Sequence, residues 1–140
     1  MKNTKKGFTL VELLVVIAIL AILAGVGVAG YTAFIKDARD SNAQTELHQV
    51  ESYIEADMLA DNVFAISDTQ RLYKDSTSGV VYQEYDATAK EWKTVAAETD
   101  ITTSLQSITD FKSFKGTFKV KGNVITYTLT EGGSATATIN

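Results

Sequence analysis

Three residues near the start of the chain have types and spacings that suggest chemistry: Gly7, Phe8 and Glu12. Glu12 lies within an apolar run, and a charged side chain near the centre of a bilayer costs about 2.5–3.5 kcal/mol. Cleavage of the peptide bond between Gly7 and Phe8 would give Phe8 a new α-amino group that is positive at neutral pH. This cation could neutralise the carboxylate of Glu12, within one chain or between chains. Pairing between chains would recruit subunits one at a time, so we interpret Phe8 and Glu12 as assembly residues.

The apolar run that must position these residues extends without a charge from residue 13 to residue 35. A helix of about 20 apolar residues suffices to cross a bilayer. Two simpler interpretations remain open: a plain transmembrane anchor, and a secretory signal cleaved near the small residues at 27–29. Three lysines before the run would hold the N-terminus in the cytoplasm. The remainder, residues 36–140, has 16 acidic and 10 basic side chains and would lie outside.

The stretch KKGFTLVELL, residues 5–14, resembles the processing site of type IV pilins and the related pseudopilins. The resemblance implies that a prepilin peptidase cleaves after Gly7 and N-methylates Phe8, and that Glu12 steers assembly. The chain would then divide into a leader (1–7), a hydrophobic transmembrane and filament-core helix (8–35) and a soluble head (36–140).

The same resemblance implies partners and a location. The partners are other copies of the chain in a helical filament, the prepilin peptidase, an inner-membrane assembly platform, and the membrane itself through residues 8–35. The precursor would span the cytoplasmic membrane once, with its head outside. The mature chain would then lie in an extracellular pilus on the cell surface.

Three glycines, Gly25, Gly27 and Gly30, lie in the second half of the apolar helix. Each costs about 1 kcal/mol relative to alanine in a helix interior. Two compatible explanations remain open. Small residues allow helices to pack closely, or the helix melts or bends locally as the subunit leaves the bilayer.

The pattern of the whole chain predicts an α+β fold, in which a long N-terminal helix packs against a small antiparallel sheet. Apolar residues recur at helical spacing from Ala43 to Met58, which predicts an amphipathic helix over residues 36–61 that continues the apolar one. Residues 62–79 are rich in turn-forming residues and are predicted to be a loop. Residues 80–140 predict four or five antiparallel strands and a short helix between Ile101 and Ile108.

Three lysines, Lys115, Lys119 and Lys121, alternate with apolar residues and predict a lysine face that could bind an acidic surface of a neighbouring subunit. DNA is the alternative ligand, but the net negative charge of the head opposes binding to phosphates, so we do not predict it. His48 lies near two glutamates at helical spacing. Because the chain has no second histidine and no cysteine to complete a ligand set, the sequence predicts no metal site, no cofactor and no enzyme.

These patterns together predict a structural protein, the subunit of a type IV pilus-like extracellular filament that is assembled from a membrane-anchored precursor after leader cleavage. The alternative is a pseudopilin of a type II secretion or competence (DNA-uptake) system. Both classes share the N-terminal motif, so the motif does not separate them.

Overall fold

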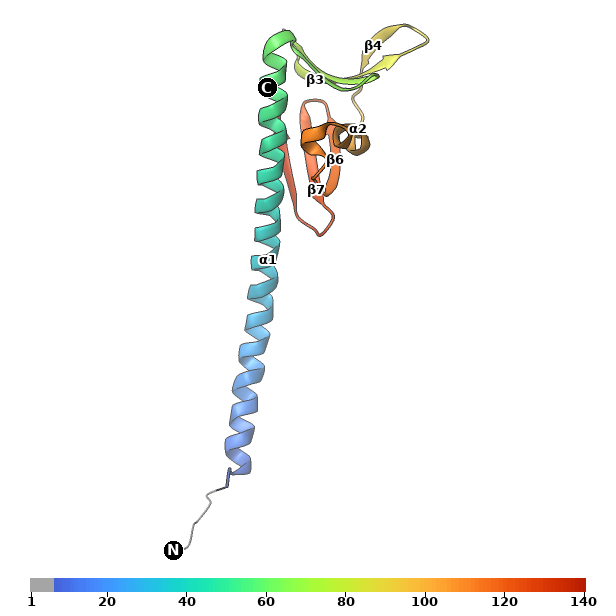
Figure 1. Ribbon diagram of the computed structural model, residues 1–140. Helices are drawn as coiled ribbons and strands as arrows, with labels where there is room; N and C mark the ends of the chain where they lie inside the picture. The colour runs from blue at the N-terminus through green and yellow to red at the C-terminus, as the bar shows by residue number, and fades with distance from the viewer. Residues whose placement is uncertain (1–6) are drawn as a thin grey trace, which may run out of the picture. The chain divides into compact units, whose positions relative to one another are not determined.

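A computed structural model describes residues 7–140 of the chain. Residues 1–6, which make up most of the predicted leader, lie outside the described residues. The chain divides into two compact units, Met1–Ile35 and Lys36–Asn140. One helix, α1 (Leu10–Asp61), contributes residues to both units (Figure 1).

The N-terminal unit consists of irregular residues 7–9 and the first part of α1. Leucine, isoleucine, valine and alanine dominate this part of the helix, and no proline interrupts it. The helix continues through Gly25, Gly27 and Gly30. Every residue from 7 to 34 is exposed, so nothing in the described chain covers this apolar surface.

The head begins with the second part of α1, which buries one face. The buried residues are those of the predicted apolar stripe, which is thereby confirmed: Ala43, Leu47, Val50, Ile54 and Met58. The helix ends at Asp61 because Asn62 adopts a positive φ of 60°. The Asn62 N–H then donates to the carbonyl of Met58 at 2.9 Å. Asparagine tolerates this left-handed conformation better than most residues, which makes it a common helix stop.

The first antiparallel sheet follows α1 directly, in the order β1-β2-β3-β4. Its strands are β1 (Val63–Ser67), β2 (Gln70–Asp75), β3 (Gly79–Asp86) and β4 (Glu91–Thr94). The prediction of a loop over residues 62–79 is therefore wrong. The strands β1 and β2 lie within this range. They carry few apolar residues between turn-forming ones, so the alternation of apolar and polar residues that predicts a strand is weak there. Burial of Phe64, Ile66 and Leu72 in the core stabilises them instead.

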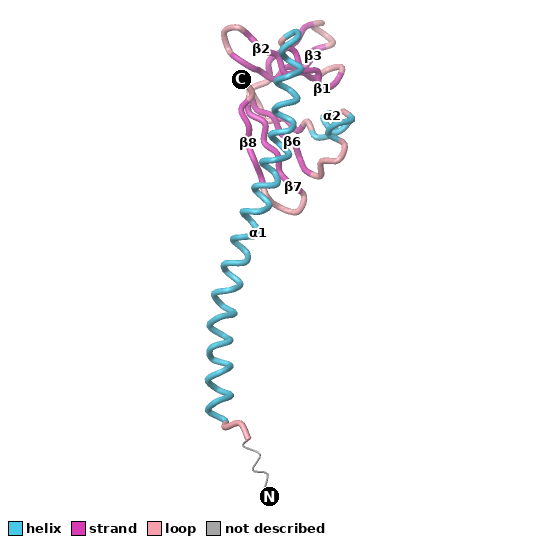
Figure 2. The backbone as a smooth tube through the Cα atoms, turned by 60° about the vertical axis from the view of Figure 1, so that its left-hand side comes forward, coloured by secondary structure: helices cyan, strands magenta, loops and turns pink. Residues whose placement is uncertain are grey.

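The second antiparallel sheet has the order β5-β6-β7-β8. Its strands are β5 (Thr99–Asp100), β6 (Gly116–Lys121), β7 (Val124–Leu129) and β8 (Ser134–Thr138). A short helix, α2 (Thr102–Ser107), and a 3-10 turn, η1 (Thr109–Phe111), connect β5 to β6. The single predicted sheet is thus corrected to two four-stranded sheets, while the short helix and the α+β class are confirmed. Figure 2 shows β6, β7 and β8 beside the head part of α1.

One core joins both sheets to α1 and α2. At its centre the rings of Phe118 and Tyr127 stack with their centroids 4.3 Å apart. Gly116 lies against the ring of Tyr127. A Cβ atom at this position would come within 2.4 Å of the ring, so only glycine fits without a shift. The hydroxyl of Tyr127 donates a hydrogen bond of 2.6 Å to Glu46 on α1. Stacking and a polar contact therefore fix the second sheet against the helix.

Candidate processing and assembly site

The predicted cleavage site lies in irregular backbone just before the first turn of α1. Gly7, Phe8 and Thr9 are all exposed, and the side chain of Phe8 is 84% accessible. Because α1 begins at Leu10, the bond between Gly7 and Phe8 takes no part in helical hydrogen bonding. A peptidase that binds its substrate in an extended conformation would find this bond free.

Glu12 and Thr9 form a reciprocal hydrogen-bonded cap at the start of α1. Oε2 of Glu12 accepts hydrogen bonds from the Thr9 N–H at 2.8 Å and from the Thr9 hydroxyl at 3.0 Å. The Glu12 N–H in turn donates to Oγ1 of Thr9 at 3.2 Å. This is a capping box, which satisfies backbone donors that the first helical turn leaves without partners. The sequence analysis missed the role of Thr9, although the spacing Thr-x-x-Glu was visible.

The cap leaves room for a second partner of the glutamate. A carboxylate has about four lone-pair positions on its two oxygens, and Oε2 accepts both of the hydrogen bonds that Thr9 donates. Oε1 forms no hydrogen bond with any residue from 7 to 140. The same carboxylate can therefore cap its own helix and accept a hydrogen bond from an ammonium group. The negative charge of Glu12 also interacts favourably with the positive end of the helix dipole.

The three glycines of the apolar helix contact no other part of the chain within residues 7–140. A Cβ atom added at Gly25, Gly27 or Gly30 would have no neighbour within 4 Å. Packing within the described chain therefore does not require glycine at these positions. By length and composition, α1 is the one helix within residues 7–140 that could cross a membrane. A role for the glycines in packing against other chains, or in melting, stays a prediction.

The predicted lysine face is not uniform in the structure. Lys119 and Lys121 lie on the exposed side of β6, whereas Lys115 precedes the strand. Lys119 already has an intrachain partner, because its Nζ lies 2.9 Å from Oε1 of Glu98. The hydrogen bond to Glu98 raises the pKa of Lys119 above its usual value. Fewer free lysine charges than predicted are therefore available to an external partner.

His48 is exposed and hydrogen-bonded to neighbours on its own helix. Its ring lies 2.8 Å from Oε2 of Glu51 and 3.1 Å from Nε2 of Gln44. Within residues 7–140 no group of three or more histidine, aspartate or glutamate side chains is placed to hold a metal ion.

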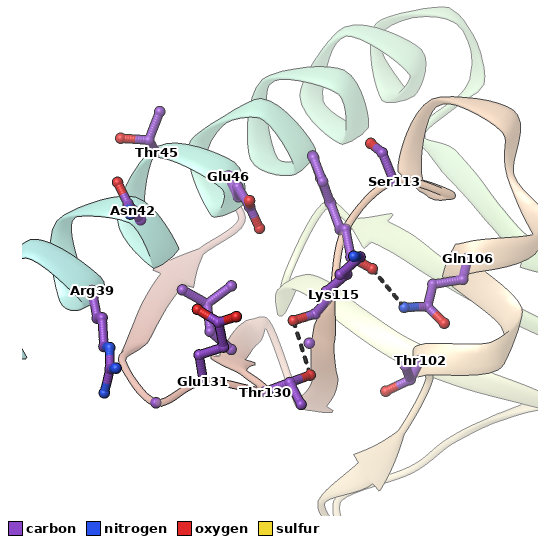
Figure 3. Close-up of a pocket in the computed structure, with 14 residues that line it drawn as sticks. Arg39, Asn42, Thr45, Glu46, Thr102, Gln106, Ser113, Lys115, Thr130 and Glu131 are labelled. Carbon is purple, nitrogen blue, oxygen red and sulfur yellow. Dashed lines mark hydrogen bonds between the residues drawn. The ribbon is translucent and has the colours of Figure 1, made fainter.

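A groove of about 760 Å³ lies between α1, α2 and the β7–β8 turn, and the sequence analysis did not predict it (Figure 3). Its polar lining comes from segments far apart in sequence and includes Arg39, Asn42, Glu46, Gln106, Lys115 and Glu131. Burial, together with the hydrogen bond to Glu46 of the lining, raises the pKa of Tyr127. The charges in the lining are mixed in sign, so the groove favours neither an anion nor a cation.

Known proteins resemble this chain in the part that contains the N-terminal site. The prokaryotic N-terminal methylation motif matches residues 2–28. The type IV major fimbrial protein FimA of Dichelobacter nodosus is 39% identical over 59 residues, which cover 42% of this chain and 38% of FimA. The type IV major alpha-pilin of Moraxella bovis is 30% identical over 74 residues, which cover 53% of this chain and 46% of that protein. A fimbrial protein of Moraxella nonliquefaciens is 49% identical over 43 residues, covering 31% and 28% of the two chains.

These similarities span less than half the length of each of the three relatives. No solved structure matched the chain. The matched relatives are fimbrial proteins, and the matched motif contains Gly7, Phe8 and Glu12. The chain therefore carries the N-terminal methylation motif of prokaryotic type IV pilins, as the sequence resemblance implied.

Proposed function

We propose that this chain is the structural subunit of a type IV pilus-like extracellular filament, made as a membrane-anchored precursor and polymerised after cleavage between Gly7 and Phe8. One observation carries the proposal: a capped, apolar helix that is exposed along residues 10–34 begins directly after the processing motif. An apolar surface of this size is stable only when lipid or other protein covers it.

In this proposal the apolar helix has two successive environments. Lipid surrounds the helix in the precursor, and the helices of other copies surround it in the filament. Removal of the leader takes away Lys2, Lys5 and Lys6 and creates the α-amino group of Phe8. That amine pairs with the free Oε1 of Glu12 on a neighbouring copy, which neutralises both charges as the helix enters the apolar filament core.

The proposal includes the partners that the motif implies. A prepilin peptidase cleaves after Gly7 and methylates Phe8, and an inner-membrane assembly platform receives the cleaved chain. The head stays outside the cytoplasmic membrane throughout. The comparisons do not favour the alternative of a secretion or DNA-uptake pseudopilin, because the matched relatives are fimbrial proteins.

The experiment that tests the proposal examines filaments sheared from cells that express the chain. We expect long filaments that contain it, with an intact mass corresponding to residues 8–140 and one methyl group. The matched control is Gly7→Val, which places a bulky β-branched residue at the cleavage site and should leave uncleaved chain in the membrane. A mature chain beginning near Gly30 would indicate an ordinary secretory signal and contradict the proposal.

A further inference from the structure

The outer face of the first sheet presents aromatic rings around one cation. Alternate residues of β2 and β3, such as Leu72 and Tyr82, are buried in the core, so their neighbours point outward. The register places Tyr73, Arg71 and Tyr85 on the outward side, opposite Val81, Gln83 and Trp92 respectively. We call this set, Arg71, Tyr73, Gln83, Tyr85 and Trp92, the aromatic face.

Arg71 is held in a fixed position on this face. Its guanidinium carbon lies 4.1 Å from the ring centroid of Trp92 and 5.2 Å from that of Tyr73. Its Nε donates a hydrogen bond of 2.9 Å to Oε1 of Gln83. Arg71 forms no ion pair with any residue from 7 to 140. The face therefore offers a preorganised cation whose outer nitrogens can bind a carboxylate with two parallel hydrogen bonds.

A second unpartnered surface lies at the C-terminal end of α1. Leu59 is 88% exposed, more than any other large apolar side chain of the head. Glu55 lies one helical turn before it, and Ala56 lies beside both. Glu55 forms no ion pair or side-chain hydrogen bond within residues 7–140. We call Glu55, Ala56 and Leu59 the Leu59 knob. Figure 1 shows the end of α1 and the β3–β4 hairpin on opposite sides of the head.

We propose that the Leu59 knob of one copy docks on the aromatic face of the next copy in the filament. The carboxylate of Glu55 pairs with Arg71, and Leu59 packs on the rings of Tyr85 and Trp92. The two surfaces match in chemistry, since each combines exposed apolar area with one unpaired charge, and the charges are opposite. Tryptophan, tyrosine and arginine are also the residue types that dominate the energetics of protein interfaces.

The partner that docks on the aromatic face is a second copy of this chain, because the chain carries both the aromatic face and the Leu59 knob that complements it. Two different surfaces of one molecule form a head-to-tail contact, and such a contact produces an open helical assembly when the rotation does not close a ring. The inference rests on the proposed filament function and adds a specific contact between heads to it.

Engineered disulfides test the contact directly, because the chain contains no cysteine. The test pair is Ala56→Cys with Thr94→Cys, which places one thiol on the knob and one on the exposed end of the aromatic face. Mild oxidation of filaments should give a ladder of covalent oligomers on a non-reducing gel. The control pair is Ala56→Cys with Thr136→Cys, because Thr136 is exposed on β8 of the second sheet, whereas the aromatic face lies on the first sheet.

A charge exchange supplies the second test. Glu55 is exposed and forms no ion pair or side-chain hydrogen bond within residues 7–140, so Glu55→Arg should leave the head folded. It should reduce filament number about tenfold or more. Combining it with Arg71→Glu should restore most of the filaments. Lys112→Glu changes the charge of an exposed residue that belongs to neither surface nor to the predicted lysine face, so it should leave filament number unchanged.

Failure of the docking and failure of the proposed function give different results. Normal filaments without a ladder from the test pair, or with an equal ladder from the control pair, would overturn the docking and leave the filament function intact. Normal filament numbers from Glu55→Arg would do the same. A wild-type chain that is cleaved but never forms filaments would contradict the proposed function itself.

Discussion

At the scale of single residues, the carboxylate of Glu12 is the group whose position most needs an explanation. The cap formed with Thr9 supplies part of it, because the glutamate has hydrogen-bond partners before any second chain arrives. A capping box alone does not require the residue to be charged, since glutamine caps in the same way. The charge therefore needs a separate cause, and pairing with the amine of Phe8 is the one we propose.

The first prediction separates these two roles of Glu12. Glu12→Gln keeps the side chain that caps Thr9 but removes the charge, and Glu12→Ala removes both. We expect both variants to be inserted and cleaved, because neither substitution changes the proposed cleavage site at Gly7 and Phe8, but to form few or no filaments. The incoming amine of Phe8 would be buried without a partner, and breaking such a pair costs about 3–5 kcal/mol. Cleaved chain in membranes and filaments outside the cell are counted separately.

The control for this prediction is Thr9→Ala, which removes the capping hydroxyl and keeps the carboxylate. This variant should assemble nearly as well as the wild type, because losing a capping side chain costs only about 1 kcal/mol. Normal filament numbers from Glu12→Gln would show that the cap, rather than the charge, explains the glutamate.

At the scale of elements, the β7–β8 hairpin is fixed to α1 by close backbone approach. Gly133 has a φ of 100°, and a Cβ atom there would lie 2.6 Å from the carbonyl carbon of Arg39. One residue later, the Ser134 N–H donates to Oδ1 of Asp40 at 3.0 Å. The hydrogen bonds that Asp40 accepts from the Lys36 ammonium and from the Ser134 N–H lower the pKa of Asp40.

The second prediction concerns this approach. Gly133→Ala should destabilise the head by the cost of a positive φ, about 1–2 kcal/mol, plus about 1–3 kcal/mol for the steric overlap with Arg39. The matched control is Gly79→Ala, where φ is 71° but no atom lies within 4 Å of the added Cβ. The Gly79→Ala control should lose only the stability that the positive φ costs, about 1–2 kcal/mol. Urea unfolding of both variants measures the difference, and equal losses would mean that the contact with Arg39 is easily relieved.

The third prediction concerns the β3–β4 hairpin and pH. Hydrogen bonds from Lys93 and from the backbone N–H groups of Ala89 and Thr88 lower the pKa of Asp86 to about 2. Protons therefore bind the unfolded chain more readily than the folded one between pH 3.8 and about 2. The stability that the ionised Asp86 contributes to the head is therefore fully present above pH 3.8 and is lost as the pH falls to about 2.

Asp86→Asn should therefore lower the stability of the head at neutral pH and flatten its dependence on pH across that window. Urea unfolding midpoints measured at several pH values provide the test. Asp57→Asn is the control, because Asp57 forms no side-chain hydrogen bond or ion pair within residues 7–140, and its pH profile should follow the wild type. A profile for Asp86→Asn as steep as the wild type would contradict the assignment to Asp86.

The elements that sequence predicts well are those whose own periodicity is strong. The stripe of α1 recurs over four turns, and β6 and β7 alternate cleanly around Gly122, so both were predictable. The strands β1 and β2 were missed because tertiary burial of a few residues, and not local pattern, stabilises them. The groove beside Glu46 has no local signal at all, since its lining comes from four separate segments. Of the N-terminal site, the motif was readable in the sequence, and the capping box of Thr9 was missed although its spacing to Glu12 was visible.

At the scale of the whole molecule, the exposed apolar surface and the buried core belong to separate units. Each of the residues from 7 to 34 is exposed, and the buried apolar residues among those described all lie between Ala43 and Ile139. The N-terminal unit therefore depends on lipid or other chains for cover, whereas the head carries a core of its own. Such a division would allow the apolar helix to change its surroundings during the proposed assembly without disturbing the fold of the head.

The fourth prediction tests this division by removing residues 1–35. The remaining chain keeps all the buried residues of the core, and its first helical turn retains Asp37 and Asp40, whose charges favour a helix N-terminus. We therefore expect residues 36–140 to be a soluble monomer with one cooperative thermal transition. Leu47→Asp is the matched control, because an unpaired carboxylate at a fully buried position should abolish that transition. Sedimentation and calorimetry provide the measurements. Aggregation of the unaltered fragment, or melting without a transition, would mean that the head needs the apolar helix to fold, and the division into two units would then be wrong.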